Sequence, residues 1–404
     1  MLRVPGSLTS LVWLTLGAFA IGTEGFMIAG LLPTLARDLT VSLPAAGQLV
    51  TVFSLAYATA APVMAVLTAG FERRRLLAVA MGGFTLANLL AALAPDYAGL
   101  MAARLLLALS AAIFMPAAGG YAAELVGPER HGRALAAVTG GLTVAIIAGV
   151  PLGVLLGDGF GWRATFLGVA AVAALSTIGI LAWLPRQPPG ATARLVERLA
   201  LARRVDVLAV LVTTVLTVAG TFTVYTYLGP FVGDVAGLGA RGLAAVLLVF
   251  GIASAVGTRL GGSAADHWGP RTTVLAGCGL VLVAYVALSI GAALGQAASL
   301  PVLLPAILLW GAASWGVVTA QQARLVALAP DLAAVSLSLN SSAIYLGSAA
   351  GAAMGALVIS EGPVGRLGWV AAGISLAALL TVLGSGKGRI RHSSAPGPER
   401  PADG

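Results

Sequence analysis

The sequence predicts an all-α membrane protein with twelve transmembrane helices arranged in two pseudo-symmetric six-helix halves. Hydrophobic residues make up 59% of the 404-residue chain and charged residues only 9%, whereas a typical soluble domain carries about 25% charged residues. Twelve long apolar segments alternate with short polar connections, and parts of the two halves resemble each other. Because the polar groups are too few to cover a water-facing surface, the chain belongs in a bilayer.

The predicted spans are continuous apolar runs rather than alternating patterns, which favours helices over a β-barrel. A helix of about 20 apolar residues crosses the hydrocarbon core of a bilayer. The expected spans are residues 11–35, 45–69, 76–94, 98–123, 134–157, 164–184, 207–231, 241–263, 272–294, 300–322, 333–359 and 366–384.

Basic residues predict the orientation of these spans. With the N-terminus inside, 17 Lys and Arg residues fall in cytoplasmic segments and 4 in external loops. This bias predicts that both termini are cytoplasmic. It also assigns the net charge of +8 to topology and lipid head groups, so no nucleic-acid partner is expected. Arginine is used almost to the exclusion of lysine, which is typical of GC-rich bacteria and favours a bacterial cytoplasmic (inner) membrane.

Several classes of function are disfavoured by what the sequence lacks. Cys278 is the only cysteine, and the three histidines lie in polar connections, so no metal site or other cofactor is expected. No Ser/His/Asp arrangement suggests an enzyme, and no GxxxxGK[ST] motif supports ATP-driven transport. A channel would show polar residues repeated along a pore, whereas this sequence shows two similar halves and one deep acid. We expect a monomer, with a small-molecule substrate, protons and the lipid bilayer as its partners.

The chain divides into four parts. Residues 1–184 form an N-terminal six-helix half and residues 207–384 a C-terminal one. Between them, residues 185–206 are Pro-rich and then basic and amphipathic, which favours a linker on the cytoplasmic membrane surface. Residues 385–404 are rich in Gly, Ser, Pro and charge, which predicts a disordered cytoplasmic tail.

The fifth span of each half carries small residues at every fourth position. They are Gly141, Ala145, Gly149, Gly153 and Gly157 in one half, and Ala343, Gly347, Gly351 and Gly355 in the other. This spacing places them on one helix face, where they allow close approach of backbones. We expect this face to pack against the other half. Two parallel halves with close-packed helices between them are an architecture of secondary transporters.

Glu24 lies near the middle of the first span, and a charge there costs roughly 2.5–3.5 kcal/mol. The other 14 acids lie in loops, tails or at helix ends. A buried carboxyl that gains and loses a proton as its surroundings alternate would couple transport to protons. The alternative is a protonated acid that only bonds neighbouring helices. Arg104, the other deep charge, stays charged and is expected to pair with Glu24 or with backbone carbonyls, either to tune that acid or as a structural group.

Four stretches carry recognisable motifs. They are Gly22-Thr23 to Phe26 with Gly30-Leu31-Leu32-Pro33, Arg104 in the fourth span, Gly149-Val150-Pro151-Leu152-Gly153 with Gly157, and the loop with Gly262, Asp266, Gly269 and Arg271. With them the chain resembles the major facilitator superfamily over about residues 10–385. Within it, the chain is most similar to the twelve-span drug:proton antiporters of the chloramphenicol- and arabinose-efflux branch. The resemblance implies the major facilitator fold and export of drug-like molecules in exchange for protons.

The resemblance also implies roles for two motifs. In the antiporter motif, Gly149, Pro151, Gly153 and Gly157, the proline bends the helix and the glycines seal the two halves against leak; plain helix packing is the alternative. In the gating motif, Gly262, Asp266, Gly269 and Arg271, charge and helix-dipole contacts lock the closed cytoplasmic face; the alternative is a loop that only sets topology.

The sequence also departs from the family pattern. The first-half counterpart of the gating motif, TAGFERRR, lacks the aspartate, and Ala108 stands where the family has a glycine. Many relatives carry the first-helix acid at the position of Gly25, one residue after Glu24. A one-residue shift turns a side chain by about 100° around the helix.

The substrate site is expected between the halves near the bilayer midplane. Candidates are aromatic and polar residues at mid-span, each of which could instead be core or lipid-facing. They are Phe26, Met27, Tyr57, Phe114, Met115, Phe222, Tyr225, Trp310, Trp315, Asn340 and Tyr345. Arg104 is the only basic residue expected inside, so a neutral amphipathic compound is favoured. The function expected is proton-driven export of such compounds; the alternative is export of a natural metabolite such as a sugar, nucleoside or secondary metabolite.

Overall fold

The structure is a computed structural model that describes residues 7–126, 128–189, 200, 201 and 203–385. Within these ranges, twelve helical segments are long and apolar enough to cross a membrane, which confirms the predicted number of spans and the all-α fold. Residues 190–199 and 202 of the predicted linker, and the predicted tail beyond Ser385, lie outside the described residues.

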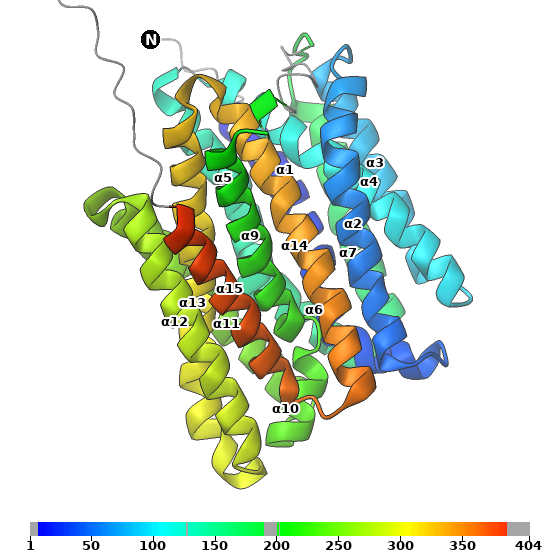
Figure 1. Cartoon of the computed structure of the whole chain (residues 1–404). Helices are drawn as coiled ribbons and strands as arrows, with labels where there is room; N and C mark the ends of the chain where they lie inside the picture. The colour runs from blue at the N-terminus through cyan, green and yellow to red at the C-terminus, as the bar shows by residue number, and fades with distance from the viewer. Residues whose placement is uncertain (1–6, 127, 190–199, 202, 386–404) are drawn as a thin grey trace, which may run out of the picture.

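The first group of helices contains six spans, coloured from blue through cyan in Figure 1. Its elements are α1 (Ser7–Asp38), α2 (Leu43–Leu67), α3 (Arg73–Ala92), α4 (Tyr97–Leu125), the 3₁₀ turn η1 (Pro128–Arg130), α5 (His131–Val144), the π-helical turn η2 (Ala145–Gly149), α6 (Val150–Phe160) and α7 (Trp162–Trp183). We call the membrane face at which α1 begins the terminal face, because α15 of the second group ends there after an even number of spans.

The second group contains the other six spans. Its elements are α9 (Val205–Tyr225), α10 (Leu228–Ala236), α11 (Ala240–Trp268), α12 (Pro270–Ala293), α13 (Gln296–Leu328), the 3₁₀ turn η3 (Pro330–Leu332), α14 (Ala333–Glu361) and α15 (Arg366–Gly384).

Local sequence signals set several helix ends. Ser42 and Asp96 accept hydrogen bonds from the N–H groups of Ala45 and Gly99, and so cap α2 and α4. Gly269 joins α11 to α12 with a φ of 82°, in the left-handed region that favours glycine. Pro270 then opens α12 at a position where its missing N–H costs no hydrogen bond.

Two predicted spans are not regular helices. The fifth contains the π turn η2 directly before α6, and the N–H of Val150 donates to the carbonyl of Ala145. Pro151 lies just after this turn and has no N–H to continue a regular ladder. The seventh was expected to run unbroken over 207–231, but α9 ends at Tyr225 and α10 begins at Leu228. This break places Pro230 in the first turn of a new helix, where proline is tolerated.

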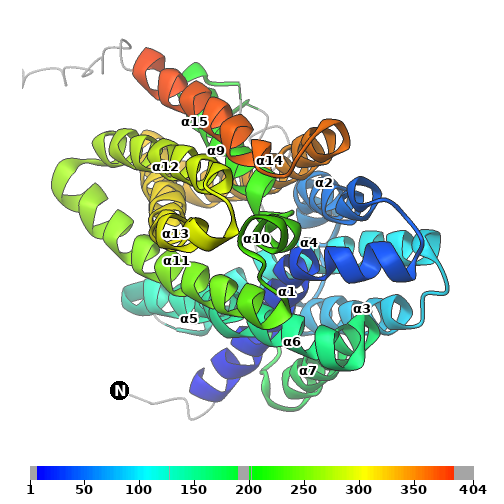
Figure 2. The same cartoon turned by 90° about the horizontal axis from the view of Figure 1, so that it is seen from below.

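The two groups meet along three sets of contacts. Helix α2 packs against α14, η2 and α6 pack against α11, and α10 packs against α1. Figure 2 shows α10 at the centre of the face opposite the termini, with helices of both groups around it. Tyr227 lies just before α10, and its ring occupies the space that a Cβ at Gly47 of α2 would need. The groups are therefore tightly joined on the side opposite the terminal face.

Candidate functional site

An ion pair lies in the interior of the first group. Glu24 on α1 and Arg104 on α4 are both fully buried, and Nη1 of Arg104 donates to Oε1 of Glu24. The Nε of Arg104 donates to the carbonyl of Leu49 on α2 at 3.1 Å, and its guanidinium lies 4.3 Å from the centroid of the Phe53 ring. Arg104 therefore meets both kinds of partner that the sequence suggested.

This pair keeps unused hydrogen-bonding capacity. Oε2 of Glu24 and Nη2 of Arg104 are buried and have no partner among the described residues. A second arginine within a span, Arg259 of α11, has an exposed side chain. Sequence reasoning overlooked Arg259, but Glu24 and Arg104 remain the buried acid and the buried arginine of the described chain. A buried ion pair whose remaining donors and acceptors lack hydrogen-bond partners is energetically costly. This cost favours a functional role over a purely structural one.

Two tyrosines connect this ion pair to the second group. The rings of Tyr57 on α2 and Tyr345 on α14 are stacked, with centroids 3.6 Å apart and planes 23° apart. The ring centroid of Tyr345 also lies 6.3 Å from that of Phe53, the ring that contacts Arg104. The second group therefore approaches the ion pair across Phe53, through the ring of Tyr345.

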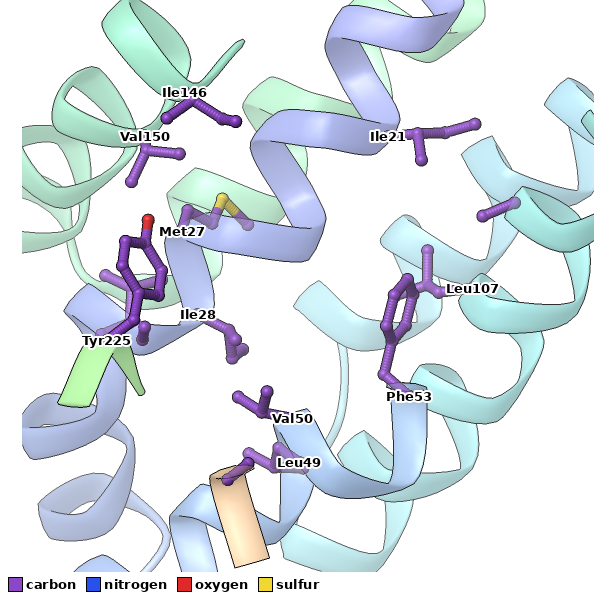
Figure 3. Close-up of a cluster of buried hydrophobic side chains, with 14 of the residues drawn as sticks. Ile21, Met27, Ile28, Leu49, Val50, Phe53, Leu107, Ile146, Val150 and Tyr225 are labelled. Atoms are coloured by element: carbon purple, nitrogen blue, oxygen red, sulfur yellow. The ribbon is translucent and has the colours of Figure 1, made fainter. Parts of the chain in front are cut away.

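A cluster of aromatic rings crosses the boundary between the groups. The centroid of Phe26 on α1 lies 5.8 Å from that of Tyr225, 5.9 Å from that of Phe222 and 6.2 Å from that of Trp315. Figure 3 shows Tyr225 reaching toward Met27 and α6 of the first group. Phe26, Phe222 and Trp315 each keep part of their surface exposed. Such rings offer stacking surfaces to an apolar or aromatic compound.

Four other substrate candidates are packed within the two groups. Met27 packs on the antiporter-motif helix beside Gly153, and Phe114 fills the space above Gly17 within the first group. Met115 is partly buried against the same core. Trp310 is fully buried inside the second group, with its centroid 4.6 Å from that of Phe250. Phe114 and Met115 therefore belong to the packing of the first group, whereas Trp310 supports the aromatic cluster from behind, with its centroid 6.5 Å from that of Tyr225.

The second group has a buried polar network without charge. Thr221 on α9 lies 3.2 Å from the hydroxyl of Tyr285 and donates to Oγ of Ser314 at 3.3 Å. Nearer the terminal face, Thr214 donates to Oδ1 of Asn340 at 3.1 Å, and Gln321 donates to the carbonyl of Val210. Of these residues the sequence analysis named only Asn340. The threonines at positions 213, 217 and 221 share one face of α9, and this spacing of four was the signal that could have revealed the network.

The glycines of the antiporter motif face α1, not the other half. A Cβ at Gly149 would collide with Oγ1 of Thr23, one at Gly153 would lie 3.3 Å from Cβ of Met27, and one at Gly157 would press on Leu31. The expected packing across the halves is therefore wrong for these residues. The contact across the groups comes instead from η2, because a Cβ at Gly251 of α11 would lie 2.7 Å from the carbonyl oxygen of Ile146.

Comparisons with known proteins agree with this architecture. The sequence profile of the Major Facilitator Superfamily matches residues 14–352. The chain belongs to this superfamily. It is a transporter and not an enzyme, and its twelve spans make it a multi-pass membrane protein.

Relatives of similar length extend the comparison. The inner membrane transport protein YdhP of Escherichia coli (strain K12) is 36% identical over 374 residues, covering 91% of this chain and 94% of YdhP. A chloramphenicol resistance protein of Streptomyces lividans is 34% identical over 376 residues, with the same coverages. The uncharacterized MFS-type transporter YbcL of Bacillus subtilis (strain 168) is 34% identical over 371 residues, covering 92% and 94%. These relatives support an inner-membrane location for the transporter.

Solved structures show the same fold. A bacterial homologue of the human lysosomal transporter Spinster, in an inward-facing and unoccupied conformation, matches with a TM-score of 0.70 and 15% identity over 95% of this chain and 99% of that one. The human organic anion transporter MFSD10 matches with a TM-score of 0.69 and 17% identity, covering 93% and 98%. The predicted major facilitator fold is confirmed.

The gating motif of this transporter lies at the terminal face. Gly269 forms the turn between α11 and α12, and Arg271 donates to the carbonyls of Val382 and Leu383 at the end of α15. Asp266 is exposed and makes no hydrogen bond or ion pair within the described chain. Gly262 faces Thr319 of α13 without a close contact. Arg271 thus contacts a helix C-terminus, as a helix-dipole interaction requires.

Proposed function

We propose that the transporter exports small amphipathic, drug-like molecules in exchange for protons. The observation that carries this proposal is the buried pair of Glu24 and Arg104. The pair lies beside Phe53, whose ring centroid is 6.3 Å from that of Tyr345 in the second group. Glu24 is the one carboxylic acid buried within the described chain, so it is the natural group to bind and release a proton inside the membrane.

The proposed coupling follows from the charge balance of this pair. When Glu24 is ionised, it neutralises Arg104 and the pair is compatible with burial. When Glu24 is protonated, Arg104 is left without its counter-charge, and burial of a lone charge is strongly unfavourable. The protonated protein should therefore favour a conformation in which Arg104 gains water or another partner. A proton taken up from one side would in this way shift the balance between the two orientations of the site.

The proposed substrate class follows from the aromatic cluster around Phe26. Its rings offer apolar surface, and Arg104 is the one buried basic residue of the described chain. The site therefore suits a neutral amphipathic compound better than a multiply anionic one. The chloramphenicol resistance protein of Streptomyces lividans makes chloramphenicol a sensible first probe.

Export of a natural metabolite is the second candidate. The uncharged hydroxyl and amide groups around Thr221 and Asn340 favour it, because such groups suit the hydroxyls of a sugar or nucleoside. Competition by a panel of sugars and nucleosides against chloramphenicol transport would separate the two candidates.

Topology and domain organisation complete the proposal. The 17-to-4 distribution of Lys and Arg supports a cytoplasmic terminal face, so that both termini are cytoplasmic. Residues 1–184 and 207–384 would then be the two halves that rock about a central site in a monomer, joined by the linker 185–206. The gating motif would stabilise the closed state of the cytoplasmic face. The antiporter motif would pack α6 against α1.

The test is transport into proteoliposomes with an imposed pH gradient. We expect Glu24→Gln to keep the fold, since glutamine preserves size and a hydrogen-bonding amide, and to abolish concentrative chloramphenicol transport while downhill exchange survives. Exchange of one proton for a neutral compound moves charge, so membrane potential should also drive export, by roughly 2.3 kcal/mol per charge per 100 mV. Full concentrative transport by Glu24→Gln would exclude Glu24 from coupling.

A second variant uses the acid position of the relatives. A Cβ at Gly25 would lie 3.9 Å from the nearest atom, Cε1 of Phe53, so a side chain fits there beside the ring that contacts Arg104. Glu24→Gln combined with Gly25→Asp should regain part of the pH-driven transport. If it transports no better than Glu24→Gln alone, the side-chain direction of Glu24 is essential as well as its charge.

A further inference from the structure

Two corners of the terminal face are built alike. In the first group, the start of α3 meets the ends of α4 and α7. Arg74 donates from Nη2 to the carbonyl of Leu181 near the end of α7. Arg73 forms an ion pair with Glu124 on α4, with Nη2 and Oε1 2.6 Å apart. One arginine therefore neutralises a helix C-terminus, and the other has a carboxylate.

In the second group, the start of α12 meets the ends of α13 and α15 in the same way. Arg271 donates from Nη2 to the carbonyls of Val382 at 3.2 Å and Leu383 at 3.4 Å, as Arg74 does on α7. The sequence near the end of α13 also resembles the sequence at the end of α4. Residues 123–126 read AELV and residues 323–326 read ARLV, so Arg324 stands where the first group has Glu124.

The change from Glu124 in the first group to Arg324 in the second reverses a charge. It leaves Arg271 and Arg324 close to each other. Arg271 and Arg324 lie close enough to repel each other. Arg324 donates from Nη2 to Oγ of Ser385 at 3.1 Å, and its Nη1 is buried without a partner among the described residues. No carboxylate of the described chain forms an ion pair with either arginine. The C-terminus of α15 supplies only about half a negative charge, which does not balance two guanidinium groups.

We propose that this corner binds the phosphate group of an anionic phospholipid. A phosphate accepts several charge-assisted hydrogen bonds and would bind the part-buried guanidinium of Arg324, in which Nη1 has no acceptor among the described residues. Arg271 lies in the first turn of α12 and Arg324 four residues before the end of α13, so both are expected at the level of the lipid head groups. Basic pockets between transmembrane helices at that level bind such head groups. The lipid would neutralise the second group from outside the chain, as Glu124 neutralises the first group from within.

The experiment measures lipid binding to the purified full-length protein in detergent by native mass spectrometry. The probes are phosphatidylglycerol, phosphatidylcholine and inorganic phosphate. We expect the protein to prefer phosphatidylglycerol. Arg324→Gln should weaken that binding about fivefold, equivalent to about 1 kcal/mol for one basic residue at a membrane surface. Arg133→Gln, which removes an exposed charge near the start of α5, is the matched control and should change nothing.

A second variant tests whether any loss of phosphatidylglycerol binding is caused by misfolding. Arg324→Glu places a carboxylate near Arg271, so it should fold and should lose the preference for phosphatidylglycerol. Equal phosphatidylglycerol binding by the wild type, Arg324→Gln and Arg324→Glu would overturn the site. Binding of inorganic phosphate without any preference for phosphatidylglycerol over phosphatidylcholine would overturn the lipid assignment.

Discussion

The two six-helix groups bury different kinds of polar side chain, although their helices run in the same order. The first group encloses the carboxyl–guanidinium pair of Glu24 and Arg104, whereas the second encloses hydroxyls and amides around Thr221 and Asn340. A charge responds to protonation and to voltage, and a neutral network does neither. The difference suggests a division of labour in which the first group senses the proton and the second contributes mainly to substrate binding. Tyr345 of the second group stacks on Tyr57 of the first, near the ion pair.

The largest expected effect comes from breaking the ion pair. Arg104→Leu would leave Glu24 buried without its partner, which typically costs about 3–5 kcal/mol. We expect a large fall in the melting temperature of the purified protein. Glu24→Leu combined with Arg104→Leu should recover most of that stability, because the uncompensated charge is gone.

Arg163→Leu is the control for this comparison. Its guanidinium stacks on Trp162 and donates to the carbonyl of Ala94 near the membrane surface, so its loss should be mild. If Arg104→Leu melts at the same temperature as Arg163→Leu, the ion pair does not distinguish the first group energetically.

The connection between the groups should give the next largest effect. Tyr345→Phe keeps a ring stacked on Tyr57 but removes the Tyr345 hydroxyl. If this hydroxyl hydrogen-bonds Glu24 during the transport cycle, its contribution of about 1 kcal/mol predicts a roughly fivefold fall in pH-driven accumulation while downhill exchange persists. Tyr227→Phe, a buried tyrosine that donates to the carbonyl of Ala352, is the matched control. Equal coupling in both variants would mean that Tyr345 does not connect the groups.

The neutral network should affect affinity and not coupling. Thr221→Val removes a hydroxyl while keeping a similar shape, so the Michaelis constant for chloramphenicol should rise by a factor of roughly two to five, as expected for one hydrogen bond. The pH dependence of transport should stay that of the wild type. A changed pH dependence would contradict the division of labour between the groups.

The smallest effect concerns the terminal face. Burial opposes ionisation of Glu72, but hydrogen bonds from the N–H groups of Arg74, Gln187 and Arg75 outweigh it and hold its pKa below the usual value. A lowered pKa stabilises the fold above the unfolded-state pKa, and this contribution is lost as pH falls through the folded-state pKa. Glu72→Ala should cost about 1 kcal/mol at neutral pH, as for loss of a helix cap, and less in acid. A pH-independent cost in thermal melts would contradict this.

The sequence was enough for the twelve spans and for Glu24, because hydropathy and a lone deep charge are properties of the chain itself. The break after Tyr225 was missed because an apolar run gives no sign of a change in direction within it. The antiporter-motif glycines were expected to face the other half; a spacing of four shows that residues share a face but not which helix lies opposite. The sequence predicted that Arg104 pairs with Glu24 or with backbone carbonyls, and it does both. The neutral network was missed because threonine is common in membrane helices and signals no function alone.

Proton release upon substrate binding tests the central claim most directly. Purified full-length protein in weakly buffered detergent would be mixed with chloramphenicol and followed with a pH indicator. Because one carboxylic acid is buried within the described chain, we predict release of about one proton per wild-type molecule, since substrate and proton compete for the same protein conformation. Glu24→Gln should bind chloramphenicol and release none. Release of the same number of protons by Glu24→Gln would contradict the account.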